Sequence, residues 1–152
     1  MKTKKLIREQ LDNKIIKLQV LEDIAIPPSG WIYAIRQALN MSLRQLAERL
    51  SITPQSVKEI EDREKNATIS IKVLKQTAAA LDMKLVYGFI PKEKTLEKMV
   101  EARARQIASQ IVNRTSIHMG LEDQANSQER VKKAINDKAD ELIKEMQRIL
   151  WD

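Results

Sequence analysis

An all-α fold is predicted for this chain of 152 residues, because few of its residues interrupt helices and apolar residues recur at helical spacing along most of it. Gly 3 and Pro 4 leave few helix breakers, and only 3% of the residues are aromatic. The hydrophobic content of 43% is ordinary for a globular protein. The length allows one domain with appendages and a buried core.

Several classes of protein are disfavoured by composition. The chain has Cys 0, which removes disulfides and thiol chemistry and suits a reducing cytoplasm. It has no apolar run of about 18 residues, and charged residues follow the start, so neither a membrane span nor a signal peptide is expected. His118 has no second His or Cys with which to form a metal site or a nucleophilic pair. The acids of 59–65 and 137–145 alternate with Lys and Arg, and no glycine-rich phosphate loop occurs. We therefore expect no catalytic residues, no metal, no cofactor and no enzyme activity.

Residues 1–28 are predicted to form a basic N-terminal helical arm. Residues 1–20 carry six Lys and Arg against two acids, a net +4, whereas residues 29–66 carry six against five, a net +1. This concentration of charge suggests a polyanionic partner. Alternatively, the cations form the solvated face of a packing helix whose other face is Leu6, Leu11, Ile15 and Leu18.

Four helices are predicted within residues 29–82. The first follows the break at 27–30, with Trp31, Ala34, Ile35, Ala38 and Leu39 as its apolar positions. Ser42 is a suitable N-cap for the second, whose stripe is Leu43, Leu46, Ala47 and Leu50. Thr53 caps the third, with Pro54 in its first position and Ile52, Val57 and Ile60 facing inward. Ser70 caps the fourth, whose buried side is Ile71, Leu74, Ala78 and Leu81.

The second and third of these helices are separated by only a short turn, and the third is unusually polar. Because one helix ends and the next is capped within a few residues, the two helices must cross at a steep angle. The outer surface of the third helix carries Gln55, Ser56, Lys58, Glu59, Asp62 and Arg63, which are side chains that bond base edges and phosphates. This is the helix-turn-helix arrangement, which lays its second helix in the DNA major groove. The alternative is a helical hairpin used only for packing.

Residues 30–82 resemble the XRE/Cro-repressor type of DNA-binding domain. The run LAERLSITPQSVKEIE carries the likeness, through Ala47, Ile52, Thr53, Val57, Ile60 and Glu61. The resemblance implies a lambda-repressor-like helix-turn-helix domain over 29–82. Three positions depart from the family pattern: Ser51 stands where Gly is usual, Leu43 where Gln often contacts phosphate, and Pro54 where a base-reading residue is common.

Nine residues are predicted to contact double-stranded DNA. Those facing the groove are Thr53, Gln55, Ser56, Lys58 and Glu59, and those near phosphates are Ser42, Arg44, Arg63 and Lys65.

Residues 83–91 are predicted to form one short β-strand, because Leu85, Val86, Tyr87 and Phe89 are strand formers. No other stretch of the chain reads as a strand that could pair with it. We therefore expect the same segment of a second copy to complete an antiparallel ribbon, which makes these four residues the interface of a homodimer. The alternatives are a strand docked on a partner protein and an extended linker.

Residues 92–152 are predicted to form a C-terminal helical region of two amphipathic helices, arranged as a hairpin or packed on a partner. The first carries Leu96, Val100, Ile107 and Ile111, and the second carries Val131, Ile135, Ala139, Leu142, Met146 and Ile149. Residues 120–128 are the expected loop. Trp151 is either a core plug or part of an exposed docking patch, and packing is favoured.

Over most of residues 5–120 the chain also resembles the mobile mystery protein A family. The likeness rests on GWIYAIRQALNMSLRQLAERL, on MKLVYGFIPK and on the long helical tail. It implies an antitoxin-like regulator encoded beside a Fic-domain partner, acting as a sequence-specific DNA-binding repressor of its own operon. The alternative is a protein-interaction module that sequesters a Fic-type toxin through the strand and the tail. The inhibitory motif of Fic antitoxins is absent, since no Ser or Thr has Glu four residues later.

Overall fold

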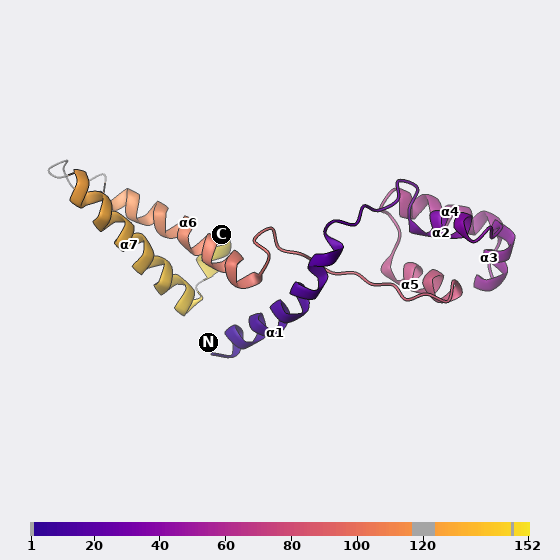
Figure 1. Cartoon of the computed structure of the whole chain (residues 1–152), viewed down its shortest axis with the longest axis horizontal. Helices are drawn as coiled ribbons and strands as arrows, with labels where there is room; N and C mark the ends of the chain where they lie inside the picture. The colour runs from indigo at the N-terminus through magenta and orange to yellow at the C-terminus, as the bar shows by residue number, and fades with distance from the viewer. Residues whose placement is uncertain (1, 117–123, 147) are drawn as a thin grey trace. The chain divides into compact units, whose positions relative to one another are not determined.

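The structure is a computed structural model, and it describes residues 2–116, 124–146 and 148–152 (Figure 1). The seven α-helices of the described residues are α1 (Lys2–Leu18), α2 (Trp31–Ala38), α3 (Leu43–Leu50), α4 (Pro54–Lys65), α5 (Ile71–Ala80), α6 (Leu96–Ser116) and α7 (Gln124–Glu145). Short 3-10 helices follow α1 at Gln19–Leu21 and end the chain at Arg148–Trp151. The all-α prediction is thus confirmed for the part of the chain that the structure describes.

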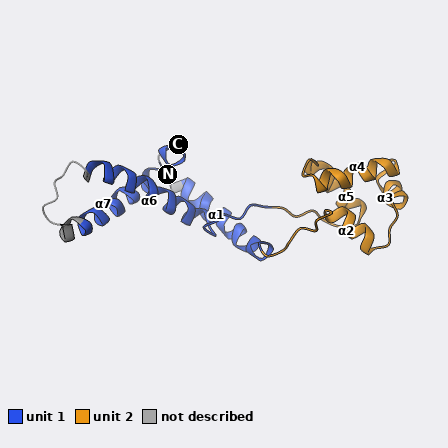
Figure 2. Ribbon diagram, turned by 90° about the horizontal axis from the view of Figure 1, so that it is seen from above, with its two compact units in different colours: residues 1–22, 88–152 blue, residues 23–87 orange. Residues whose placement is uncertain are grey.

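The chain forms two compact units, which Figure 2 distinguishes by colour. Residues 1–22 and 88–152 make the helical unit, and residues 23–87, inserted between them, make the four-helix unit. The contacts therefore group the N-terminal helix with the C-terminal region, whereas the sequence suggested separate segments at 1–28, 29–82, 83–91 and 92–152. The predicted segment 29–82 lies within the four-helix unit.

The core of the four-helix unit is small and aliphatic. Its fully buried members come from α2, α3, α4 and the end of α5, namely Ile32, Leu46, Ala47, Val57 and Leu81. Trp31 and Leu39, which the spacing assigned to the buried face of α2, are exposed. The buried positions of this helix are Ile32 and Arg36 instead, so the predicted face was wrong at its two ends. On α5, Ile71 is also exposed, and Thr77 is buried in its place.

The predicted β-strand is absent. Residues 83–90 have no regular secondary structure, and no strand occurs among the described residues. A strand exists only when its backbone groups bond a neighbouring strand, and the single chain offers no such neighbour. Val86, Tyr87 and Phe89 are exposed by 63, 58 and 88%. The segment is therefore irregular, and its large apolar side chains at 86, 87 and 89 are exposed to solvent.

The C-terminal hairpin is confirmed, since α6 and α7 pack along one another. Their shared core is completed by small residues that allow close approach, and it comprises Val100, Ala104, Ile107, Ala108, Ala139, Leu142 and Leu150. Leu150 is the plug at the end of the chain, whereas Trp151 is 53% exposed and Ile149 is 42% exposed. Residues 124–128 of the predicted loop are helical instead, because α7 begins at Gln124. Residues 120–123 and His118 lie outside the described residues.

Helix α1 attaches to α6 through polar side chains rather than through its leucines. Asp12 is 8% exposed, and its carboxylate accepts from the backbone N–H groups of Leu96 at 2.7 Å and Glu97 at 3.2 Å. The first N–H groups of an α-helix have no acceptor within the helix. The Asp12 carboxylate therefore caps the N-terminus of α6. Arg8 adds an ion pair to Glu97 at 3.0 Å. Leu6 and Leu11, predicted to pack, are 53 and 43% exposed.

Loss of the Asp12 carboxylate should therefore detach the start of α6. We expect Asp12→Ala to lower the free energy of unfolding by about 1–2 kcal/mol, as for other lost N-caps, and to speed hydrogen exchange at the amides of Leu96 and Glu97. Asp23→Ala, at an exposed aspartate, is the matched control for urea unfolding and NMR-detected exchange. Unchanged protection of those two amides would contradict the capping role.

Candidate nucleic-acid interface

The turn between α3 and α4 is fixed by side-chain caps at both helix starts. Ser42 accepts from the N–H of Gln45 at 3.1 Å, and the Gln45 side chain accepts in return from the N–H of Ser42 at 2.8 Å. This pair is a capping box. Thr53 accepts from the N–H of Ser56 at 3.1 Å, and Pro54 occupies the first position of α4. Both predicted caps are confirmed.

Ser51 ends α3 in the left-handed conformation, with φ 56 and ψ 42. A side chain in this region costs about 1 kcal/mol relative to glycine. Ser51 therefore adopts the left-handed conformation that glycine favours, at the position where the family pattern has Gly. The next residue, Ile52, is 37% exposed, so its predicted inward position is wrong, and Val57 and the half-buried Ile60 anchor α4 instead.

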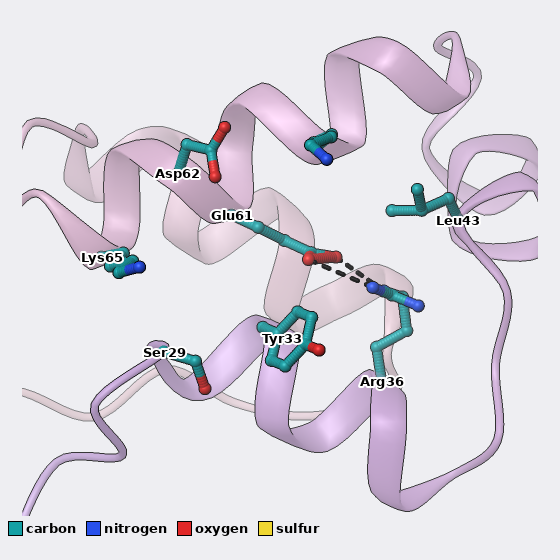
Figure 3. A pocket seen from close by; sticks show the side chains of 8 residues that line it. Ser29, Tyr33, Arg36, Leu43, Glu61, Asp62 and Lys65 are labelled. Atoms are coloured by element: carbon teal, nitrogen blue, oxygen red, sulfur yellow. Dashed lines mark hydrogen bonds and ion pairs between the residues drawn. The ribbon is translucent and has the colours of Figure 1, made fainter.

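A buried ion pair holds α2 against α4. The Arg36 Nε donates to Glu61 Oε1 at 2.6 Å, and Nη2 donates to Oε2 at 3.2 Å, with side-chain exposures of 8 and 6%. Arg36 Nη1 also donates to the backbone oxygen of Met41 at 2.9 Å, and its guanidinium lies 5.4 Å from the centre of the Tyr33 ring. Figure 3 shows the two charged groups pointing toward one another between the helices. This bidentate geometry fixes the rotation of α4 about its axis.

A second contact between the same helices caps α2. Glu64 Oε1 accepts from the N–H of Ile32 at 2.8 Å, at the first turn of α2. Gly30, with φ 87, precedes this helix, and a Cβ there would lie 2.7 Å from the same carboxylate oxygen. Glycine is therefore needed at position 30 both for its backbone conformation and for the approach of Glu64.

With Val57, Glu61 and Glu64 turned inward, the opposite face of α4 is polar and open to solvent. Gln55, Glu59 and Asp62 lie at helical spacings of four and three residues along it, and all are exposed. Lys58 and Lys65 share the side nearer α2, where they line a cavity of about 310 Å³ with Ser29, Tyr33 and Asp62. Ser56 and Arg63 lie seven residues apart on the other side.

Most of the predicted DNA contacts lie on this surface, and all but Ser56 are exposed. Gln55, Ser56, Lys58, Glu59, Arg63 and Lys65 come from α4, Thr53 from its cap, and Ser42 and Arg44 from the start of α3. The oxygens of Ser42 and Thr53 are used in capping, and Thr53 Oγ1 lies 2.8 Å from Ser56 Oγ. The hydroxyl of Ser42 can still donate while its oxygen accepts.

Arg44 pairs with Glu48 four residues later at 3.2 Å, and both side chains are largely exposed. Such a surface pair contributes little, about 0.3–0.5 kcal/mol. A phosphate can therefore replace Glu48 as the partner of Arg44 at small cost.

Residues 32–87 match the family model described as helix-turn-helix. This segment is a helix-turn-helix domain. The match supports the XRE type of DNA-binding regulator. It covers α2 to α5 and the start of the extended segment. No curated protein and no solved structure matches the chain significantly, and nothing in these comparisons supports the narrower resemblance to mobile mystery protein A.

No three His, Asp or Glu side chains of the described residues gather as metal ligands would. No helix in the described ranges combines the length and the apolar character needed to cross a bilayer.

The residues that orient the helix-turn-helix domain were missed by the sequence reasoning. Arg36 follows Ile32 by four residues, and Glu61 follows Val57 by four, so each charge lies on the buried stripe of its helix. Two opposite charges on facing apolar stripes are the signal that could have predicted the pair. Buried charges occur almost only when paired.

Removing one partner of the ion pair should destabilise the helix-turn-helix domain more than replacing both partners by apolar residues. Arg36→Met leaves Glu61 buried without its partner, and we expect a loss of about 3–5 kcal/mol in the free energy of unfolding. The double variant Arg36→Met with Glu61→Leu should recover most of that loss, because both charges are gone. Urea unfolding followed by circular dichroism measures both. A double variant as unstable as Arg36→Met would refute this account of the pair.

Proposed function

We propose that the protein is a sequence-specific regulator of transcription that binds double-stranded DNA with α4 in the major groove. The observation that carries the proposal is the exposed polar face of α4, held in one orientation by the Arg36–Glu61 pair and by two N-caps. Because any surface helix has a polar outer side, the proposal rests on this face together with the helix-turn-helix match over residues 32–87. The proposal places the protein in the cytoplasm with the DNA and gives it no catalytic role.

Within this proposal Gln55 is the principal reader of bases. It lies in the first turn of α4, directly after Pro54, and its side chain is exposed. A glutamine amide can bond the N6 and N7 atoms of adenine together. Glu59 follows on the same face and can accept from the amino group of cytosine. Lys58 and Ser56 flank these readers.

The electrostatic contribution of the helix-turn-helix unit should be modest. Residues 23–87 carry nine Lys and Arg against seven Asp and Glu, a net +2. Four cations belong to the proposed contact set, namely Arg44, Lys58, Arg63 and Lys65. If all four neutralise phosphates, log K should fall with log salt with a slope of about −3.6 per unit bound. Specific contacts by α4 must then supply much of the discrimination.

The proposal is tested by selecting DNA from a random library and comparing variants on the enriched sequence. We expect Gln55→Ala to weaken binding to that sequence by about 1–3 kcal/mol and to leave binding to random DNA within about twofold. Fluorescence anisotropy at one fixed salt concentration measures both. Gln37→Ala, at an exposed glutamine on α2, is the matched control and should bind as wild type does. Failure to enrich any sequence, or equal losses on both DNAs, would contradict the proposal.

We also propose that the regulator binds as a homodimer through residues 83–90. This segment has no regular secondary structure, and Val86, Tyr87 and Phe89 are exposed. An apolar cavity of about 470 Å³ adjoins it on the helix-turn-helix unit, with Ile26, Trp31, Ile69 and Leu85 among its walls. A second copy could pair its own segment here and cover these side chains. A dimer would present two copies of α4, as two-fold half-sites require.

Assembly can be tested by removing one backbone donor from the segment. Val86→Pro loses an N–H and fixes φ, and we expect it to raise the dimer dissociation constant by at least about tenfold. Val86→Thr keeps the donor and the β-branched shape, so it should remain dimeric. Sedimentation velocity over a concentration series distinguishes them. A monomeric wild type, or a Val86→Pro dimer of unchanged affinity, would contradict this interface.

A protein-interaction role is the second candidate, and the exposed apolar side chains of 86–89 favour it. In that reading the same segment and the helical tail hold a protein partner, and the helix-turn-helix domain is only a scaffold. Repression of its own operon, an antitoxin role and a Fic-domain partner are supported only by the likeness to mobile mystery protein A. The polyanion role of the N-terminal arm is a proposal for the exposed Lys4, Lys5, Lys14 and Lys17, because Arg8 is engaged by Glu97.

A further inference from the structure

The backbone of residues 84–90 makes no hydrogen bond to any described residue. Met83 donates its N–H to the oxygen of Ala78 at 2.8 Å, and the next backbone bond along the chain is the one from Lys94 to Pro91 at 2.9 Å. A run of unpaired N–H and C=O groups in an exposed segment is a template for pairing with a strand of another chain.

An apolar cavity adjoins the start of this run on the helix-turn-helix unit. Its volume is about 470 Å³, and residues of α2, α5 and 83–86 form most of its walls. Of the residues that line it, Glu64 and Lys84 are charged and the others are apolar. Glu64 already accepts from the N–H of Ile32 at 2.8 Å. The lining therefore suits an apolar occupant, and an apolar cavity of about 150 Å³ is already large enough for a benzene ring.

Phe89 is an apolar side chain that the single chain leaves uncovered. It is the one phenylalanine of the sequence, and its exposure of 88% is the highest among the large apolar side chains of the described residues. It follows Val86, the last residue of the cavity wall, by three residues. The unpaired backbone, the cavity and this side chain thus occur within one short stretch of sequence.

Two-fold symmetry decides which residues of two paired copies face one another. In an antiparallel ribbon of identical chains, the axis passes through one pair of identical residues. With Val86 on the axis, Phe89 of one copy lies opposite Met83 of the other; with Tyr87 on the axis, it lies opposite Leu85. Both Met83 and Leu85 line the cavity. Because opposite side chains share a face, with Cβ atoms about 4.5–5.5 Å apart, either register brings the phenyl ring to the cavity wall.

We propose that Phe89 of each copy fills the apolar cavity on the helix-turn-helix unit of the other copy. This inference rests on the homodimer proposed above and adds the side chain that anchors it. The exchange is reciprocal, as a two-fold interface requires. A buried aromatic side chain in a closely packed pocket is typical of the residues that dominate interface energies.

Sedimentation velocity over a concentration series tests the anchor. Phe89→Ala should raise the dimer dissociation constant by at least about tenfold, because both cavities lose their occupant, and Phe89→Leu should raise it less. The side chain is exposed in a single copy, so its truncation leaves the packing within the chain unchanged. Leu39→Ala, which shortens an exposed side chain outside the cavity, is the control and should dimerise as wild type does.

The outcomes separate this inference from the proposal on which it rests. A Phe89→Ala dimer of unchanged affinity, in a protein whose dimer Val86→Pro disrupts, would overturn the anchor and leave the homodimer standing. A monomeric wild type would overturn both.

Fluorescence reports the cavity side of the contact. Trp31 lines the cavity and is 43% exposed. In a Trp151→Phe background it is the remaining tryptophan of the chain, and its emission should move to shorter wavelength as the dimer forms. Adding Phe89→Ala should abolish that shift even at concentrations where the dimer persists. Emission that does not change on dimerisation, or a shift that survives Phe89→Ala, would overturn the assignment.

Disulfide cross-linking locates the phenylalanine directly, because the chain has Cys 0 and each introduced cysteine is the only one in its chain. Phe89→Cys chains are mixed with Met83→Cys or Leu85→Cys chains above the dissociation constant and oxidised mildly. One of the two mixtures, according to the register, should give a cross-linked heterodimer, since a disulfide requires Cα atoms within about 7 Å. Leu39→Cys chains should give none. Failure to cross-link with either wall residue, or equal cross-linking with Leu39→Cys, would overturn the proposal.

Discussion

The buried pair of Arg36 and Glu61 joins the two helices whose relative rotation decides which side of α4 reaches solvent. Its bonds of 2.6 and 3.2 Å are directional, whereas aliphatic contacts of Val57 alone would tolerate a rotated helix. Glu64, three residues after Glu61, adds a second contact by capping α2, beside Gly30 with its positive φ. Two carboxylates of α4 therefore face inward, and Gln55, Glu59 and Asp62 face outward as a consequence. The small aliphatic core supplies stability, and the polar contacts supply orientation.

In the helical unit too, polar contacts between helices fix how the helices are oriented. Asp12 of α1 occupies the N-terminus of α6, where its negative charge meets both the unpaired N–H groups and the positive end of the helix dipole. Arg8 pairs with Glu97 one turn away along α1. In both units, side chains of one helix satisfy the end or the buried charge of another. A chain with only one phenylalanine and few other aromatics relies on such polar joints, because large side chains are scarce.

The sequence predicted what is local and missed what depends on two distant elements. Ser42, Thr53 and Ser70 each cap the predicted helix, because the cap bond spans only three residues. The spacing of Leu46, Ala47 and Val57 found the core for a similar reason. By contrast, the sequence analysis did not predict the pairing of Arg36 with Glu61, since only the packed helices reveal that both are buried. The exposure of Leu6 and Leu11 and the role of Asp12 likewise depend on which face α6 contacts.

The helix-turn-helix unit is inserted within the sequence of the helical unit. The chain leaves the helical unit after residue 22 and returns to it at residue 88. Within the helical unit Leu18 contacts Gly88, where an added Cβ would clash with the leucine side chain. The two chain segments that lead to residues 23–87 thus leave the helical unit close together. This contact and the bonds of Asp12 and Arg8 to the start of α6 hold α1 and the C-terminal region in one unit, although residues 23–87 separate them in the sequence.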